Sequence, residues 1–114
     1  MPVASFVMRL SRSTQAANCF KEAADRIGRV YLHPDFMQGG KLKVQIAADK
    51  AELAPGGYRS RLVPYKHTAN KIRFVEEVDE AGELGDLYVS KQVLARLKLE
   101  ETQAIAVRLS VEDA

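Results

Sequence analysis

Apolar and polar residues alternate with period two along much of the chain, and this pattern constrains the fold more than any other feature. The clearest run covers 41–47, where Leu42, Val44 and Ile46 are separated by polar side chains. Because successive strand residues point to opposite faces of a sheet, such alternation predicts strands with one buried face. We expect strands at 4–10, 19–22, 29–32, 41–47, 58–63, 71–76, 87–89 and 103–111.

Helical patterns are sparse. Ser90 is a good N-cap residue, and Val93, Leu94 and Leu97 follow it at helical spacing, so 90–97 is predicted to form a short helix. A turn of helix over 34–37 would have the matching role earlier in the chain. Turns are expected at Gly39-Gly40 and at Pro55-Gly56-Gly57.

The sequence contains an apparent internal repeat. Segment 20–25 matches 74–79 in Phe-x-Glu and Asp at a constant offset of 54, and segment 27–32 matches 84–89 in a Gly-x-x-Tyr step. The alternating run 42–46 then matches 105–109. We interpret this as a duplication, and chance similarity among β-rich segments is the alternative.

A duplication has consequences for the fold. Each unit supplies two or three strands, too few to bury a face alone. We therefore expect one domain over 1–114, built from unit one at about 4–49 and unit two at about 58–113. The predicted fold is mainly β with one or two short helices, a small sandwich or barrel with internal pseudo-two-fold symmetry.

The matched residues of the Gly-x-x-Tyr step also have expected roles. Gly28 and Gly85 would lead into the two Tyr strands at points where a side chain does not fit. Tyr31 and Tyr88 are expected to be equivalent core or rim aromatics. Their functional alternative is a pair of stacking platforms.

Charge is distributed unevenly along the 114 residues. The formal net charge is only +2, yet residues 1–73 carry 13 basic and 5 acidic residues, whereas 74–114 carry 4 basic and 10 acidic ones. No acidic residue occurs from Leu53 to Val75. Such asymmetry indicates an anionic partner, unless the two halves lie together in the fold and neutralise each other.

The basic segment also interleaves cations with aromatic residues. Cations can contact phosphates and exposed aromatic rings can stack on bases, so this segment predicts a nucleic-acid interface. The residues predicted to form it are Arg59, Arg61, Tyr65, Lys66, Lys71 and Arg73, and Arg9, Arg12, Lys41 and Lys43 would extend it. The alternative is a protein-interaction or self-assembling module, such as a homodimer whose basic hairpin meets the acidic segment of another copy.

No catalytic or metal-binding pattern is visible. Cys19, His33 and His67 have no metal-ligand spacing, and Cys19 is expected to be a small buried thiol. The carboxylates at 76–83 are expected to form a solvated face at a hairpin tip. We predict no enzyme activity, no cofactor and no metal. The longest apolar stretches are about five residues, so no membrane partner is expected, and the predicted location is the cytoplasm.

Residues 84–99, followed by Gln103-Ala-Ile-Ala-Val-Arg-Leu109, resemble half of an AbrB-type swapped-hairpin domain. The chain has Ser90 where that family has Pro, and Glu100-Glu101-Thr102 in place of its Gly-Asp turn. The resemblance implies an intertwined dimer that binds DNA and regulates transcription, with 58–73 supplying the basic strand. The duplicated unit is also similar to small phage and mobile-element proteins of unknown function. We therefore expect a small non-catalytic binding protein, encoded by a bacterial or mobile-element genome, that binds DNA or RNA or has a regulatory role.

Overall fold

Every segment in which alternation predicts a strand forms one in the computed structural model, which describes residues 3–24, 26–33, 40–76, 84 and 86–112. The mainly β fold is therefore confirmed. β1 and β5 extend further than their alternation indicated. The strands are β1 (Ala4–Ser13), β2 (Asn18–Glu22), β3 (Val30–Leu32), β4 (Lys41–Ala47), β5 (Tyr58–His67), β6 (Lys71–Glu76), β7 (Asp86–Ser90) and β8 (Ile105–Glu112).

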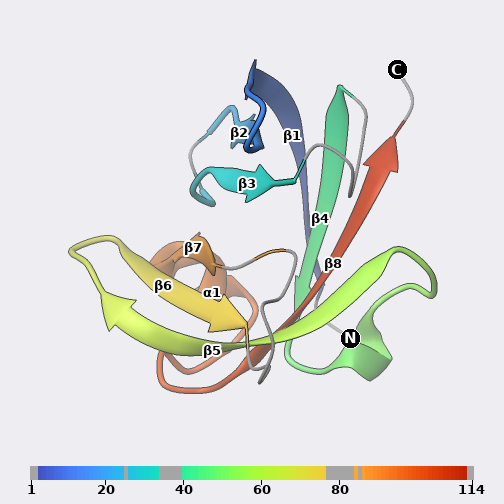
Figure 1. Ribbon diagram of the computed structural model, residues 1–114. Coiled ribbons are helices and arrows are strands. Elements are labelled where there is room, and N and C mark those ends of the chain that lie inside the picture. Colours follow the sequence, from blue (N-terminus) through green and yellow to red (C-terminus); the bar gives the residue numbers. More distant parts are fainter. Residues whose placement is uncertain (1–2, 25, 34–39, 77–83, 85, 113–114) are drawn as a thin grey trace.

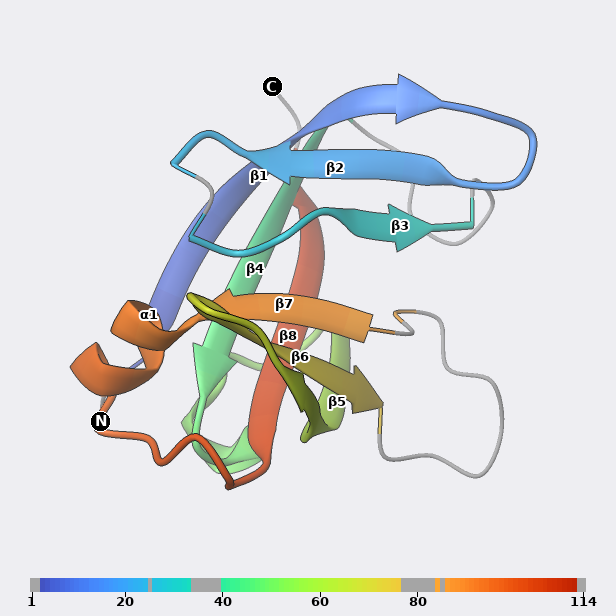
Figure 2. The ribbon, with the colours of Figure 1, turned by 90° about the vertical axis from the view of Figure 1, so that its left-hand side faces the viewer.

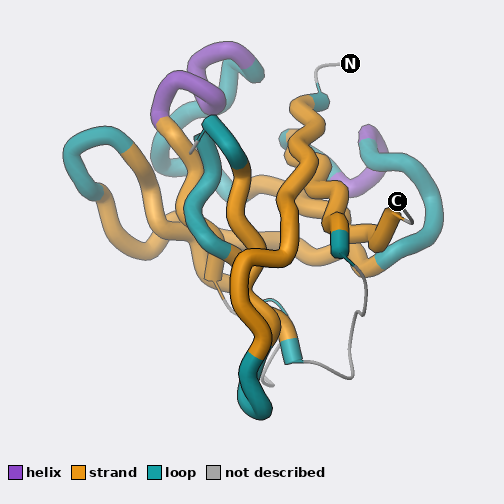
Figure 3. The backbone as a smooth tube through the Cα atoms, turned by 90° about the horizontal axis from the view of Figure 1, so that it is seen from above, coloured by secondary structure: helices purple, strands orange, loops and turns teal. Residues whose placement is uncertain are grey.

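The predicted helix also forms, as α1 (Lys91–Arg96). The Ser90 hydroxyl caps it by accepting a hydrogen bond of 3.2 Å from the Gln92 N–H. A short 3₁₀ helix, η1 (Lys50–Glu52), was not expected; it begins where the Asp49 side chain accepts from the Ala51 N–H. The two helices lie at opposite sides of the molecule (Figure 3). The helical turn expected at 34–37 lies outside the described residues.

All eight strands form one antiparallel sheet in the order β3-β2-β1-β4-β8-β5-β6-β7. In Figure 1 the long strands β1, β4 and β8 connect the β2–β3 pair above to the β5–β6 hairpin below. The sheet curls until its two edge strands face each other (Figure 2). The result is a nearly closed barrel, one of the two architectures expected from the sequence.

Backbone contacts at Ile27 and Gly28 close most of the gap between the edges. Ile27 forms an isolated bridge with Val89, and the Gly28 N–H donates to the Tyr88 carbonyl over 2.7 Å. A Cβ atom at position 28 would lie 2.7 Å from the Tyr88 Cβ. The expectation that no side chain fits at Gly28 is confirmed, and the cause is the approach of β7. Gly85 lies outside the described part of the chain.

The inward faces of both halves supply the core. Phe20 of β2 and Phe74 of β6 are the largest of its fully buried side chains. A smaller cluster of Ala47, Leu53 and Ala106 lies apart from this core. The turn before β5 is fastened to the sheet by Arg108, whose guanidinium donates to the carbonyls of Pro55 and Gly56. Gly56 and Gly57 both have positive φ there, so the predicted turn is confirmed.

The register of β1 with β2 matches that of β5 with β6. Leu10 pairs with Phe20, and Pro64 pairs with Phe74, 54 residues later. In each pair the register shifts immediately after that position, by a bulge. The connecting turns also agree, because Thr14 bonds to Ala17 as Thr68 bonds to Lys71.

Candidate nucleic-acid interface

The structure divides the predicted β5–β6 interface into two separate groups. Arg59 and Arg61 are exposed on β5 and lie beside β8. Lys66 lies at the far end of the strand, beyond the bulge, opposite Arg73 of β6. The apolar pair formed by Val63 and Val75 separates the two groups. Lys71 begins β6 and is partly buried.

Arg73 is engaged within the protein. Its Nε and Nη2 atoms both lie 2.9 Å from Oδ2 of Asp86 on β7. Its guanidinium carbon lies 5.1 Å from the centre of the Tyr65 ring, a cation–π contact. Tyr65 itself remains 66% exposed. At Arg73, an acidic side chain from the second half balances the charge, as the alternative interpretation of the charge asymmetry expected.

A second basic surface lies on β2, β1 and β4. It consists of Lys21, Arg9 and Lys41, and we call it the cation row. Arg9 of β1 is directly opposite Lys21 of β2 on one side and Lys41 of β4 on the other. Residues directly opposite on antiparallel strands share a face, and this face is the outer one because the neighbouring Met8 and Leu42 are buried. Three cations therefore stand side by side across three strands.

In the described part of the chain, few carboxylates lie near the cation row in sequence or in register. Within the described strands, the one acidic residue in register with it is Glu112, opposite Lys41 on β8. Across the described part of 3–48 the one acidic residue is Glu22, and its side chain is only 3% exposed. Among the side chains that the structure describes, none forms a salt bridge with Lys21, Arg9 or Lys41. Lys43 adds a further cation, two residues along β4 from Lys41.

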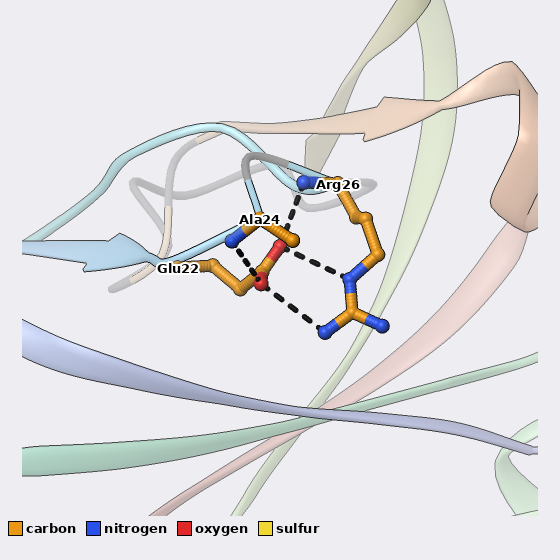
Figure 4. Close-up of polar contacts among 3 residues, drawn as sticks. All are labelled: Glu22, Ala24 and Arg26. Atoms are coloured by element: carbon orange, nitrogen blue, oxygen red, sulfur yellow. Dashed lines mark hydrogen bonds and ion pairs between the residues drawn. The ribbon is translucent and has the colours of Figure 1, made fainter.

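Glu22 forms its contacts inside the barrel wall (Figure 4). Its carboxylate accepts hydrogen bonds from the backbone N–H groups of Ala24 (2.8 Å) and Arg26 (2.6 Å), and from the Arg26 guanidinium at 3.1 Å. Burial acts to raise the pKa of Glu22, but the hydrogen bonds and the Arg26 charge outweigh it and lower the pKa below its ordinary value. Glu22 is thus a buried carboxylate that is already paired with Arg26, and it does not balance the cations of the outer face.

Beside the cation row, the outer face is hollowed into a depression of about 310 Å³. We call it the Tyr31 depression. It lies between the β1–β2 hairpin and β3, and Cys19 is opposite both Arg12 and Tyr31 in register. Cys19 is buried, as expected, whereas the Tyr31 side chain is 53% exposed. The charged and hydroxyl-bearing residues that line the depression are Arg12, Lys21, Arg29, Tyr31, Ser11 and Thr14.

Sequence reasoning named part of this surface and missed the rest. Arg9, Arg12, Lys41 and Lys43 were expected as extensions of the hairpin site, but Lys21 and Arg29 were not considered. The β2 strand was predicted, but it is the pairing of β2 with β1 that places Lys21 beside Arg9. The register needed for that pairing is not visible in either strand alone.

Other expected groups have structural rather than catalytic surroundings. The expectation that Glu76 lies on a solvated face is wrong, because its carboxylate accepts hydrogen bonds from Tyr58, Ser60 and the Leu84 N–H. Positions 77–83 lie outside the described residues. His67 pairs with Glu101 at 3.6 Å. Among the residues that the structure describes, no three His, Cys, Asp or Glu side chains could share a metal ion. None of the described helices has the length and apolar character needed to cross a membrane.

Comparison of the sequence with protein-family models and with curated proteins gives no match. Residues 84–109, which resemble half of an AbrB-type domain, cover β7, α1 and the first part of β8 in that order. Membership of that family remains a prediction.

Proposed function

We propose that the protein binds nucleic acid through its phosphates, using the outer face of β2, β1 and β4. The observation that carries this proposal is the cation row. Like charges directly opposite on neighbouring strands destabilise a sheet. A polyanion bound along the row would relieve that repulsion and gain the free energy of counterion release.

Protection of sheet edges does not account for the row. Lys and Arg often occupy edge strands, where they prevent pairing with other chains. β1 and β4 are interior strands, since each has a paired neighbour on both sides. The charges of Arg9 and Lys41 therefore call for another explanation, and an external anion supplies one.

The two repeat units differ in charge at equivalent positions, and this difference supports the same proposal. We interpret the common strand order, the shared bulge and the shared Thr turn as the result of duplication. On that alignment, Val75, Val63 and Ala104 occupy the positions of Lys21, Arg9 and Lys41. The repeated fold therefore does not require charged residues at these positions. We infer that the cations of the first unit are there to bind a ligand.

Fluorescence anisotropy tests the proposal. Labelled DNA and RNA oligonucleotides are titrated with the protein at several salt concentrations between about 25 and 300 mM. We expect the slope of log affinity against log salt to flatten by about 2 when Arg9→Ala, Lys21→Ala and Lys41→Ala are combined. The matched control combines Arg59→Ala, Arg61→Ala and Lys66→Ala, which removes the same charge from the predicted β5–β6 interface.

The control is expected to keep most of the slope. If instead the control abolishes binding and the cation-row variant does not, the interface is the β5–β6 hairpin and our assignment is wrong. Absence of binding at the lowest salt would overturn the nucleic-acid proposal altogether. Light scattering on the same samples then tests the remaining alternative, self-association through the basic and acidic parts of the chain.

A further inference from the structure

We infer that the nucleic acid is single-stranded and that the Tyr31 depression receives one unpaired base. This inference rests on the proposed function and adds the class of ligand to it. It begins from the position of Tyr31, whose half-exposed ring stands on the outer face of β3 next to three cations. An exposed aromatic ring beside a positively charged surface is the arrangement on which single-stranded bases stack.

The depression has the chemistry that a base and its flanking phosphates require. Its volume of about 310 Å³ lies at the lower end of the range for small-ligand sites, roughly 300–1,000 Å³. Arg12, Lys21 and Arg29 line it, and its described lining includes no carboxylate. The hydroxyl groups of Ser11 and Thr14 add hydrogen-bonding capacity.

Lys21 connects the depression to the cation row. It lines the depression and is also the first member of the row. From Lys21, Arg9 and Lys41 continue across two further strands, which spans about 10 Å at the usual strand separation. A free mononucleotide in the depression would leave the rest of the row unoccupied. A strand with several phosphates would occupy both.

The shape of the surface favours a single strand over a duplex. The row and the depression lie on the outer face of a nearly closed barrel, which is convex. Duplex DNA is stiff over about 150 base pairs and keeps its base faces stacked on one another, so it cannot present a base to Tyr31. A single strand can follow the curved surface and turn a base toward the ring.

The test compares three ligands with the same number of phosphates: a single-stranded oligonucleotide, a duplex with half as many base pairs as the single strand has nucleotides, and a strand with abasic sites throughout. Each is titrated against the wild type, Tyr31→Ala, Tyr31→Phe and Tyr65→Ala. Tyr65→Ala is the matched control, because it removes another exposed tyrosine. Circular dichroism verifies that each variant is folded.

For the wild type we expect the single strand to bind about 5- to 100-fold more tightly than the abasic strand. Tyr31→Ala should reduce single-strand affinity to the abasic level and leave abasic binding unchanged. Tyr31→Phe and Tyr65→Ala should retain the preference. Equal affinity for single strand and duplex, with no effect of Tyr31→Ala, would overturn this inference while leaving phosphate binding by the cation row intact. Loss of all binding to every ligand would instead count against the proposed function itself.

Discussion

Arg9 and Lys41 lie directly opposite each other on β1 and β4, with no salt bridge between either side chain and a carboxylate in the described part of the chain. Lys21 repeats the same relationship on the other side of Arg9. Like charges directly opposite each other lower the stability of a sheet. A substitution that removes this repulsion at Arg9 should therefore stabilise the fold while weakening the proposed binding.

The first prediction is that Arg9→Glu stabilises the fold and weakens nucleic-acid binding. Glu at position 9 converts two repulsive cross-strand pairs into two attractive ones, which should raise the free energy of unfolding by about 0.5–2 kcal/mol at low salt. Urea denaturation measures this. The gain should shrink at 1 M salt, where exposed charges are screened. A destabilised variant at low salt would show that the row is not repulsive.

The second prediction concerns Glu22. Glu22→Gln removes a buried, charged acceptor of backbone N–H groups and should cost about 1–3 kcal/mol at pH 7. Because folding lowers the pKa of Glu22 below 4.5, its charge stabilises the protein at pH values above that figure, and this contribution is lost as the pH falls through the lowered pKa. Urea unfolding at pH 7 and in the acid range should show wild type and variant converging at low pH. A constant gap would contradict the assignment.

The third prediction tests closure of the barrel. Gly28→Ala places a Cβ 2.7 Å from the Tyr88 Cβ, so the two edges must separate. We expect a loss of about 1–3 kcal/mol in unfolding free energy and faster hydrogen exchange at the Ser90 amide, which bonds to the Arg26 carbonyl. Gly40→Ala is the control, since no atom lies within 4 Å of its added Cβ. It should leave both measurements unchanged.

The fourth prediction concerns the ion pair of Arg73 and Asp86. Both side chains are about one-third exposed, so the pair should contribute only about 0.2–1 kcal/mol, measured by a double-mutant cycle with Arg73→Ala and Asp86→Ala. Asp86→Asn releases the Arg73 charge. If the cation row is the interface, this release should change nucleic-acid affinity less than twofold. A large gain in affinity would place the β5–β6 hairpin in the interface.

The strands and the helix could be predicted from sequence because their signals are local. Alternation in 41–47 and the Ser90 cap each depend on residues a few positions apart. The bulge that shifts β1 after Leu10 has no local signal, because it is defined by the pairing of β1 with β2. The short helix η1 does have a local cap in Asp49, but it lacks the apolar spacing that marks α1.

The candidate site could be predicted only in part, because it depends on pairing. Arg9 and Lys21 are 12 positions apart, and nothing near either residue indicates that β1 and β2 place them side by side. Glu76 was misjudged for the same reason, since the Tyr58 and Ser60 hydroxyl groups that bind it come from a different strand. Tyr31 was identified as one of a matched pair, but its exposed position near Arg12, Lys21 and Arg29 follows from the pairing of β3 with β2.

β4 and β8 pair along seven positions, from Lys41 with Glu112 to Ala47 with Ala106, and this ladder joins the two halves of the barrel. Two separate chains making such a contact would associate in proportion to their concentration. In this protein the segment between β4 and β5 links the two halves covalently. The effective concentration of one half around the other is therefore fixed by the length of that segment. The central ladder therefore forms equally well in a dilute and in a concentrated solution, and the outer face stays available to other molecules.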